Sequence, residues 1–341
     1  MPLHQSVQSL LLVGVQLHHA PAPAPAAPPA GLQPLIEALK PEHDQCNERA
    51  IEFGHRYRSA FWALYLLSAL AVLFAVLPEG LGWAGEHHPL HRYAPLWGVA
   101  ELAVIAAVVA TYLRGHKRDW QGQWLSARMQ AELMGYLPLA ATLQTSQAEG
   151  FALRWYASLA DGAEPSAEMQ RLQTLCQQHA AEALLALEGM QRDVAPWARW
   201  MRAVVAGQQH YHERVAHRYH ALQHRVHQIN AALFVLTALG TAAHLFWHQS
   251  WLLLMATVLP ALGAALHGAL AQSEAYRLEM NSRRLGAELL ALHAAIGAVD
   301  LSASETARPR LRALGQKALD LILAEHHDWH QLVRPHRLPL G

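Results

Sequence analysis

The chain has 341 residues, of which 52% are hydrophobic and 15% carry a charge. A typical soluble domain carries about 25% charged residues, so the composition argues against an ordinary soluble protein. The formal net charge is zero and no nucleic-acid-reading motif is present, so we expect no nucleic-acid partner. No nucleophile elbow, phosphate loop, zinc-protease motif or dinucleotide-binding motif occurs, so the sequence predicts neither an enzyme nor a cofactor.

Residues 1–41 are rich in proline and alanine, with a short apolar run at 9–17 and Ala-Pro repeats that continue to Ala30. This composition predicts a disordered segment, either a linker or the remnant of an upstream domain. A processed signal peptide is the alternative, because small residues follow the apolar run. No Lys or Arg precedes that run, however, which favours the linker.

Four apolar stretches follow, at about 60–77, 95–113, 229–247 and 251–270. Each approaches the roughly 20 residues that a helix needs to cross the hydrocarbon core of a bilayer. Buried core helices of a soluble bundle are the alternative, but four such stretches joined in pairs by short connections favour a membrane. The predicted fold class is therefore an all-α membrane protein, with four transmembrane helices forming two helical hairpins and with the lipid bilayer as surroundings.

The basic residues predict the orientation of these spans. The connection within the first hairpin, 78–94, holds a single basic residue, Arg92, and the connection within the second, 248–250, holds none. Lys and Arg accumulate in cytoplasmic segments, so the two chain ends and the middle segment are predicted to be cytoplasmic. The basic residues that flank the spans on this side are Arg56, Arg58, Arg114, Lys117, Arg118, Arg225, Arg277, Arg283 and Arg284.

The two hairpins resemble each other in sequence, inside and outside the spans. ALYLLSAL at 63–70 matches ALFVLTAL at 232–239, and SARMQAEL at 126–133 matches SRRLGAEL at 282–289. In this alignment Trp120 falls opposite Tyr276. Such self-similarity indicates an internal duplication.

We therefore predict one hairpin repeat at 42–150 and a second at 197–300. Because both copies begin and end on the same side, they are expected to be parallel repeats related by an axis along the membrane normal, as a pseudo-dimer.

Helices are also predicted outside the membrane. The connector 151–196 contains helical spacing over 168–192, and a helix opening at Trp197 is expected to run directly into the third span. The second span is expected to continue as a helix to Leu133, without a breaker before Pro138. The C-terminal segment 301–341 is predicted to hold one more helix, at 307–325.

Four residues within the spans are candidates for a pore or a gate. Glu101 is an ionisable group inside the second span, where such a group is costly and usually faces a bundle interior or water. It either lines a pore or lies shallow and neutral near the interface. His244 and His267 either line the same path or pack as neutral rings between helices. Pro260 interrupts the backbone hydrogen bonds of the fourth span, as a gating kink or as a static bend.

Two i,i+4 ion pairs occur at matching places of the aligned repeats, Arg128 with Glu132 and Arg284 with Glu288. Surface pairs of this kind contribute only about 0.3–0.5 kcal/mol each. Their recurrence predicts a structural contact between the repeats or between subunits, in which Trp120 and Tyr276 also take part, rather than catalysis.

The 24 histidines raise the question of a metal site. Five of them, at 210, 217, 220, 224 and 227, share one face of a predicted helix, but no cysteine or acidic cluster completes a site. A solvated face is the simpler interpretation. The weak candidates near the C-terminus are His326, His327 and His330, and we predict no metal there either.

Three segments resemble the SLATT family, the SMODS- and SLOG-associating two-TM effector domains. They are RYRSAFWALYLLSALAV at 56–72, WQGQWLSARMQAELM at 120–134 and WMRAVVAGQQHYHERVAHRYH at 200–220, and the resemblance extends over about 42–299. It implies a bacterial inner-membrane protein of a conflict system. It also implies a chain that oligomerises and forms a pore or disrupts the membrane when a sensor partner signals.

The resemblance further implies that the partner is a nucleotide-second-messenger synthase or a SLOG-domain protein. This sequence departs from that pattern, because we find neither domain in it; either a separate protein would act as the sensor, or the chain is a fragment of a longer one. Two other functions stay open: a cation or metal channel or transporter that uses Glu101 and the intramembrane histidines, and a membrane-anchored oligomerisation scaffold.

Overall fold

A computed structural model describes residues 1–15, 21–24, 26–83, 85, 88–143, eight scattered positions from 170 to 188, and 193–333, with side chains placed as far as 323. The described elements are all helical. They are α1 (Leu3–Leu11), η1 (Ala30–Leu32), α2 (Gln33–Gly80), η2 (His91–Tyr93), α3 (Ala94–Lys117), α4 (Trp120–Thr142), α8 (Val194–His244), α9 (Ser250–Gln272), α10 (Ala275–Gly297) and α11 (Ser304–Val333).

Four helical stretches of the described chain are long and apolar enough to cross a membrane. They correspond to the four predicted spans, in α2, α3, α8 and α9, so the prediction of an all-helical membrane protein with four spanning helices is confirmed by length and composition. The third span ends slightly earlier than predicted, because α8 stops at His244.

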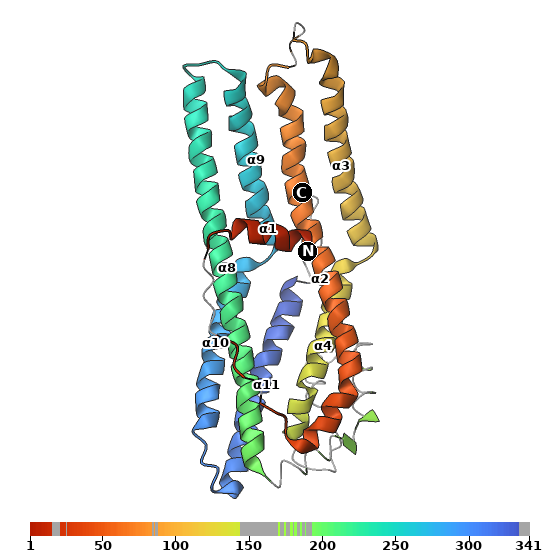
Figure 1. The fold of residues 1–341 in the computed structure, drawn as a ribbon, viewed down its shortest axis with the longest axis vertical. Coiled ribbons are helices and arrows are strands. Elements are labelled where there is room, and N and C mark those ends of the chain that lie inside the picture. The colour runs from red at the N-terminus through yellow and green to blue at the C-terminus, as the bar shows by residue number, and fades with distance from the viewer. Residues whose placement is uncertain are drawn as a thin grey trace.

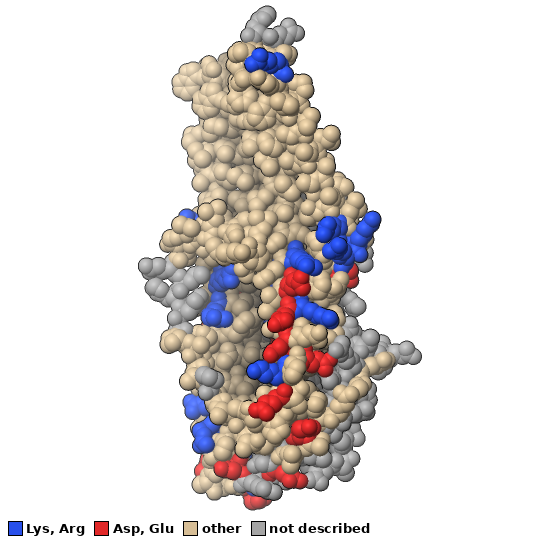
Figure 2. Space-filling view, turned by 45° about the vertical axis from the view of Figure 1, so that its right-hand side comes forward, with Lys and Arg blue, Asp and Glu red and all other residues tan. Residues whose placement is uncertain are grey.

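Two helices extend far beyond their apolar parts. α2 has 48 residues and α8 has 51, which at about 1.5 Å per residue gives lengths more than twice the roughly 30 Å hydrocarbon core. Figure 1 shows both running most of the height of the molecule. We call the half that holds α3 and α9 the hairpin end, and the half that holds α4, α10 and α11 the polar end. Charged side chains gather on the polar end (Figure 2).

The hairpin end is a single row of helices. α3 packs along α2, α2 along α9, and α9 along α8, whereas no comparable packing joins α3 to α9 or α2 to α8 in the described chain (Figure 1). The order along the row is therefore second span, first span, second span, first span. A two-fold axis would need a palindromic order, so a two-fold pseudo-dimer of hairpins does not describe this arrangement.

The polar end has a hydrophobic core of its own. α4 packs along α2, α10 packs along α8, and α11 contacts α4, α8 and α10. The large buried side chains come from all five helices, and they include Leu35, Leu137, Met201, Leu289, Leu311 and Ile322. The two hairpin units are thus joined in the polar end by α11 and by the N-terminal part of α8.

The helix predicted to continue from the second span to Leu133 breaks at Asp119. This residue adopts a left-handed conformation with φ of 43°, and its carboxylate accepts a hydrogen bond from the Gly122 N–H. The cap ends α3 and starts α4. Glu274, between α9 and α10, also has a positive φ, of 53°. Pro138 does not end α4, because buried leucines on either side of it keep the helix packed to Thr142.

These two left-handed residues align the halves one residue away from the sequence match. When Asp119 is placed opposite Glu274, six buried positions of α10 fall opposite buried positions of α4; the pairs are Trp124 with Glu279, Ala127 with Ser282, Ala131 with Gly286, Met134 with Leu289, Leu137 with Leu292, and Ala141 with Ile296. Trp120 packs against the core of the hairpin end, whereas Tyr276 is 67% exposed. The alignment of 126–133 with 282–289 therefore depends on identical residues at the surface, and it does not match the buried positions of the two helices.

The chain ends differ in part from the prediction. Within 1–41, for which composition predicts disorder, Leu3–Leu11 forms α1 and Gln33 begins α2. The reason is apolar contact, because Leu32, Leu35 and Leu39 are buried in the hydrophobic core of the polar end. Most of the predicted connector 151–196 lies outside the described residues, as do 144–150 and 334–341. The helix predicted to run from Trp197 into the third span is confirmed.

Candidate functional site

The contact between the two hairpins is made by α2 and α9, and it depends on two glycines. A Cβ atom added at Gly80 would lie under 3.0 Å from the side chain of Leu254, and one added at Gly268 would lie equally close to the Tyr65 ring. Glycine therefore lets the two backbones approach, as small residues do between membrane helices. At the lower end of the contact, Gln272 Nε2 donates a hydrogen bond to the Tyr57 hydroxyl at 3.4 Å.

The two outer helices of the row leave apolar faces uncovered. On α3 the exposed side chains are Leu96, Val99, Leu102, Ile105, Val109 and Leu113. On the apolar part of α8 they are Phe234, Val235, Leu236 and Leu239. Faces of this size and composition require lipid or another apolar helix as surroundings.

Glu101 lies on the inner side of α3. It is half-buried on the stripe that Trp97, Val104 and Val108 also occupy, and this stripe packs against α2, where Trp97 contacts the Phe74 ring at 6.1 Å. Among the described residues no ion pair or hydrogen bond to its carboxylate is recorded. Its position between two helices is consistent with the expectation that an intramembrane acid avoids lipid.

The structure does not bring the four pore candidates together within one chain. His244 ends α8 beside the outer connection, with its ring 5.7 Å from that of His248, whereas His267 is exposed near the opposite end of α9 and contacts His227 at 6.5 Å. Glu101 lies on α3, which α2 and α9 separate from α8. Pro260 is exposed on α9, and the helix continues through it.

The boundary between the two halves is held by an aromatic stack. The Arg58 guanidinium lies over the Trp124 ring at 5.1 Å, and Trp124 stacks on Tyr57 at 5.6 Å. Arg58 Nε also donates a hydrogen bond to the Gly54 carbonyl at 3.1 Å. A cation–π contact of this kind contributes about 0.5–2 kcal/mol. It fixes α4 against α2 just below the start of the first span.

Helix α1 lies across the molecule at the same height, over α2 and α8 (Figure 1). Its inner face is anchored by two hydrogen bonds from α8: Arg218 donates to the Gln8 side chain at 2.8 Å, and Arg225 to the Leu11 carbonyl at 3.2 Å. Its outer face exposes Leu3 and Leu10. An amphipathic helix with an apolar outer face at the level where the charges stop is typical of the membrane interface.

Acidification is expected to weaken the attachment of α1. His4 is 4% exposed, and its Nδ1 lies 3.1 Å from the Ser59 hydroxyl. Burial, together with the charges of Arg58, His55 and Arg218, lowers the pKa of His4 from 6.5 to about 3. Docked α1 therefore keeps this ring neutral, while undocked α1 takes up a proton below pH 6.5. The contribution of His4 to the docking free energy is fully present above pH 6.5 and decreases progressively as the pH falls toward 3.

Between pH 7.5 and 5.5 this linkage should weaken docking about tenfold. Hydrogen exchange of the α1 amides, corrected for intrinsic rates, measures the change. The variant His4→Gln removes the titrating ring and should show much less pH dependence. Equal pH dependence in both proteins would contradict the assignment to His4.

A buried carboxylate joins α8 to α10 in the polar end. Glu279 is 6% exposed. Its oxygens lie 2.9 Å from His220 Nδ1, accept a hydrogen bond from Gln223 at 2.7 Å, and pair with Arg283 at 2.7 Å. A buried charge is tolerated when it is paired and hydrogen-bonded, and here His220 and Gln223 of α8 join the two helices while Arg283 pairs within α10. This arrangement is structural.

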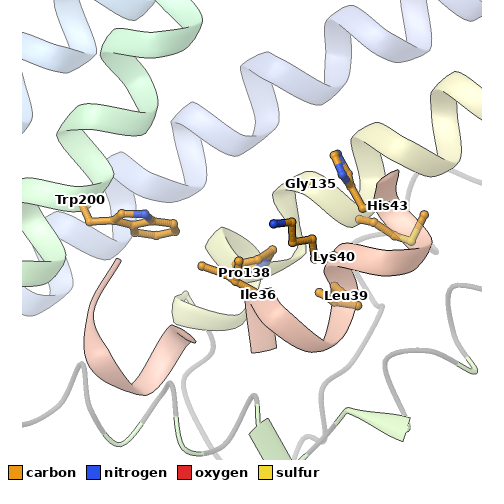
Figure 3. A pocket seen from close by; sticks show the side chains of 8 residues that line it. Ile36, Leu39, Lys40, His43, Gly135, Pro138 and Trp200 are labelled. Carbon is orange, nitrogen blue, oxygen red and sulfur yellow. The ribbon is translucent and has the colours of Figure 1, made fainter. Parts of the chain in front are cut away.

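A cavity of about 280 Å³ opens between α2, α4 and α8 in the polar end. In Figure 3 Trp200, from α8, faces the side chains of α2 and α4 across it. The lining is mostly apolar, and its two basic groups come from α2; the residues are Ile36, Leu39, Lys40, His43, Met134, Gly135, Pro138 and Trp200.

The structure describes only some of the remaining predicted residues. No group of three potential metal ligands occurs in the described part of the chain, and the side chains of His326, His327 and His330 lie outside it. Arg284 and Glu288 are exposed and 3.9 Å apart. Arg128 pairs with the less exposed Glu132. Since the structural alignment sets these pairs one residue out of step, they are not equivalent contacts.

Sequence reasoning missed several features that the fold depends on. The glycines of the α2–α9 contact could have been noticed as small residues in apolar spans, and His4 and Gln8 as the polar face of an amphipathic stretch. Nothing local to Glu279 predicts its burial. Comparison with protein families, with curated proteins and with solved structures found no match to this chain.

Proposed function

We propose that this chain is a membrane effector of a bacterial conflict system, similar to the SLATT family, that oligomerises in the inner membrane and permeabilises it on a signal from a sensor partner. The observation that carries the proposal is the open row of four apolar helices. The row encloses no polar path within one chain, because Glu101, His244 and His267 lie apart. Permeation would therefore require several copies.

The proposed unit is a duplicated hairpin, 42–150 and 197–300, with helical extensions in the cytoplasm. The recurring order of a long helix and two shorter ones supports duplication, as do the left-handed residues Asp119 and Glu274. The distribution of Lys and Arg supports the orientation, because Arg92 is the one basic residue in the two connections at the hairpin end, and Figure 2 shows charged side chains gathered on the polar end. Both chain ends would then be cytoplasmic.

The polar end is the part that a cytoplasmic sensor would contact. It has its own packed core and a cavity, and α2 and α8 lead from it into the spans without interruption. A nucleotide-second-messenger synthase or a SLOG-domain protein is the partner that we propose. A displacement at the polar end would reach the spans directly along these two helices.

The experiment compares leakage with self-association. The purified chain is reconstituted at rising protein-to-lipid ratios into vesicles that contain a self-quenched dye, and induced cells are followed with a membrane-potential dye. We expect leakage that rises more steeply than the protein concentration, and loss of potential on induction. Intact vesicles and cells, from protein that still self-associates, would overturn the effector proposal and indicate a scaffold.

One variant distinguishes a cation or metal channel from a membrane-disrupting effector. A channel that uses the intramembrane acid should lose ion selectivity or metal uptake in Glu101→Ala. An assembly of copies that simply opens the bilayer should still leak dye in the same variant. Metal-dependent flux that disappears in Glu101→Ala, with no dye leakage in either protein, would establish the channel instead.

A further inference from the structure

The contact between the two hairpins has a direction. It is made by the second span of one hairpin, α9, and the first span of the other, α2. The two units therefore use different faces, which is a heterologous contact. Between identical copies a heterologous contact does not end with one pair, since one unit keeps an unused first-span face and the other keeps an unused second-span face.

The two unused faces lie at the ends of the row. α3 is a second span with its outer face uncovered, and α8 is a first span with its outer face uncovered. α2, the other first span, is covered by α3 on one side and α9 on the other, and no large hydrophobic side chain between 60 and 80 is strongly exposed. α8, the first span of the second hairpin, thus has α9 on one side and no described span on the other.

The residues that touch in the internal contact between α2 and α9 have counterparts on the uncovered faces of α8 and α3. In the sequence match Tyr65 corresponds to Phe234, and with Asp119 opposite Glu274 the counterpart of Gly268 is Leu113. Tyr65 and Gly268 touch within the chain. Phe234 is 75% exposed and Leu113 is 46% exposed, so both are available to a neighbouring copy. Leucine is larger than glycine, so the contact between copies would be wider than the internal one.

We propose that the outer face of α3 packs against the outer face of α8 of a second copy, head to tail, and so continues the row from chain to chain. The occupant is a second copy because the missing neighbour of α8 has the same type and position as the α9 that covers α2. Successive copies form a ring if the rotation between them closes, and an open row if it does not. The inference rests on the membrane placement and self-association of the proposed function.

Cysteine pairs test the direction of the contact. In a background with Cys46→Ala and Cys176→Ala, Leu113→Cys and Phe234→Cys are made singly and together, and membranes are treated with a short apolar bifunctional maleimide. The two single variants are co-expressed in a further sample. We expect no cross-linked product from either single variant, a dimer from the mixture, and a ladder of dimer, trimer and larger species from the double variant.

Two controls separate folding and chance collision from docking. Tyr65→Cys with Gly268→Cys should give an internal cross-link without a change of chain number, which shows that the row has formed. Leu253 is an exposed residue of α9, between the two row ends. Leu253→Cys mixed with Leu113→Cys should give no dimer.

Dimers from either single variant would show a two-fold contact and overturn the proposal. A mixture without cross-links, from protein that forms the internal Tyr65–Gly268 link, would show that lipid alone covers these faces and would also overturn it. Dye release is read from the same preparations. A ladder without leakage overturns the proposed function and leaves the contact standing, and leakage without a ladder does the reverse.

Discussion

Gly80→Ala and Gly268→Ala should each destabilise the protein by about 1–3 kcal/mol, the usual cost of overpacking a close contact. The added methyl group would lie under 3.0 Å from Leu254 or from Tyr65. In an exposed helix the same change would be favourable by up to about 1 kcal/mol, because alanine is the better helix former. The sign of the effect therefore tests whether α2 and α9 meet at these residues.

Gly98 is the matched control, because it lies in an apolar span on α3 with nothing within 4 Å of an added Cβ. Gly98→Ala should leave the thermal midpoint in detergent unchanged or raised. Tyr65→Ala should relieve the clash in Gly268→Ala, so the two changes should be strongly non-additive. Equal midpoints for Gly98→Ala and Gly268→Ala would place α9 away from α2.

The same variants connect stability to function. If the internal α2–α9 contact holds the two hairpins in one row, its disruption should separate them within the chain and weaken any assembly that continues the row. Cross-linking between copies through Leu113 and Phe234 should then fall together with the thermal midpoint. A variant that loses the internal contact but still gives the ladder of cross-linked species would show that the contact within the chain and the contact between copies are independent.

Composition alone was enough to predict the four spans, because hydropathy is a local property of about 20 consecutive residues. The order of those spans is not local. It depends on contacts such as that of Gly268 with Tyr65, which are far apart in the sequence and do not alter hydropathy. The four spans were therefore predictable, whereas their order along the row was not.

Burial explains the other differences in the same way. The matching letters around Arg128 and Arg284 belong to the polar surface, which places few constraints on register. The buried positions that align in the structure, such as Trp124 and Glu279, carry chemically different side chains. A comparison of the two sequences therefore does not align them. Likewise α1 is held by Arg218 and Arg225, which lie more than 200 residues away, so the Pro/Ala-rich surroundings of α1 pointed to disorder.

Trp197→Ala should be the most destabilising of the changes considered, by about 3–5 kcal/mol, the range for removing a buried tryptophan. Trp197 is 2% exposed in the core where α8 meets α4 and α11, and its indole N–H donates a hydrogen bond to the Thr142 hydroxyl at 3.2 Å. Denaturant unfolding in detergent, followed by tryptophan fluorescence and circular dichroism, measures the loss.

Two variants divide this effect between packing and hydrogen bonding. Trp197→Phe keeps most of the apolar volume and loses the indole donor, so it should cost about 1–2 kcal/mol, and Thr142→Val in addition should add little. Because the core around Trp197 joins the two hairpin units, Trp197→Ala should also make the polar end sensitive to protease while the spans stay in the membrane. A loss below about 1 kcal/mol in Trp197→Ala would show that α8 and α4 do not share this core, and a signal received at the polar end would then have to reach the two hairpins separately.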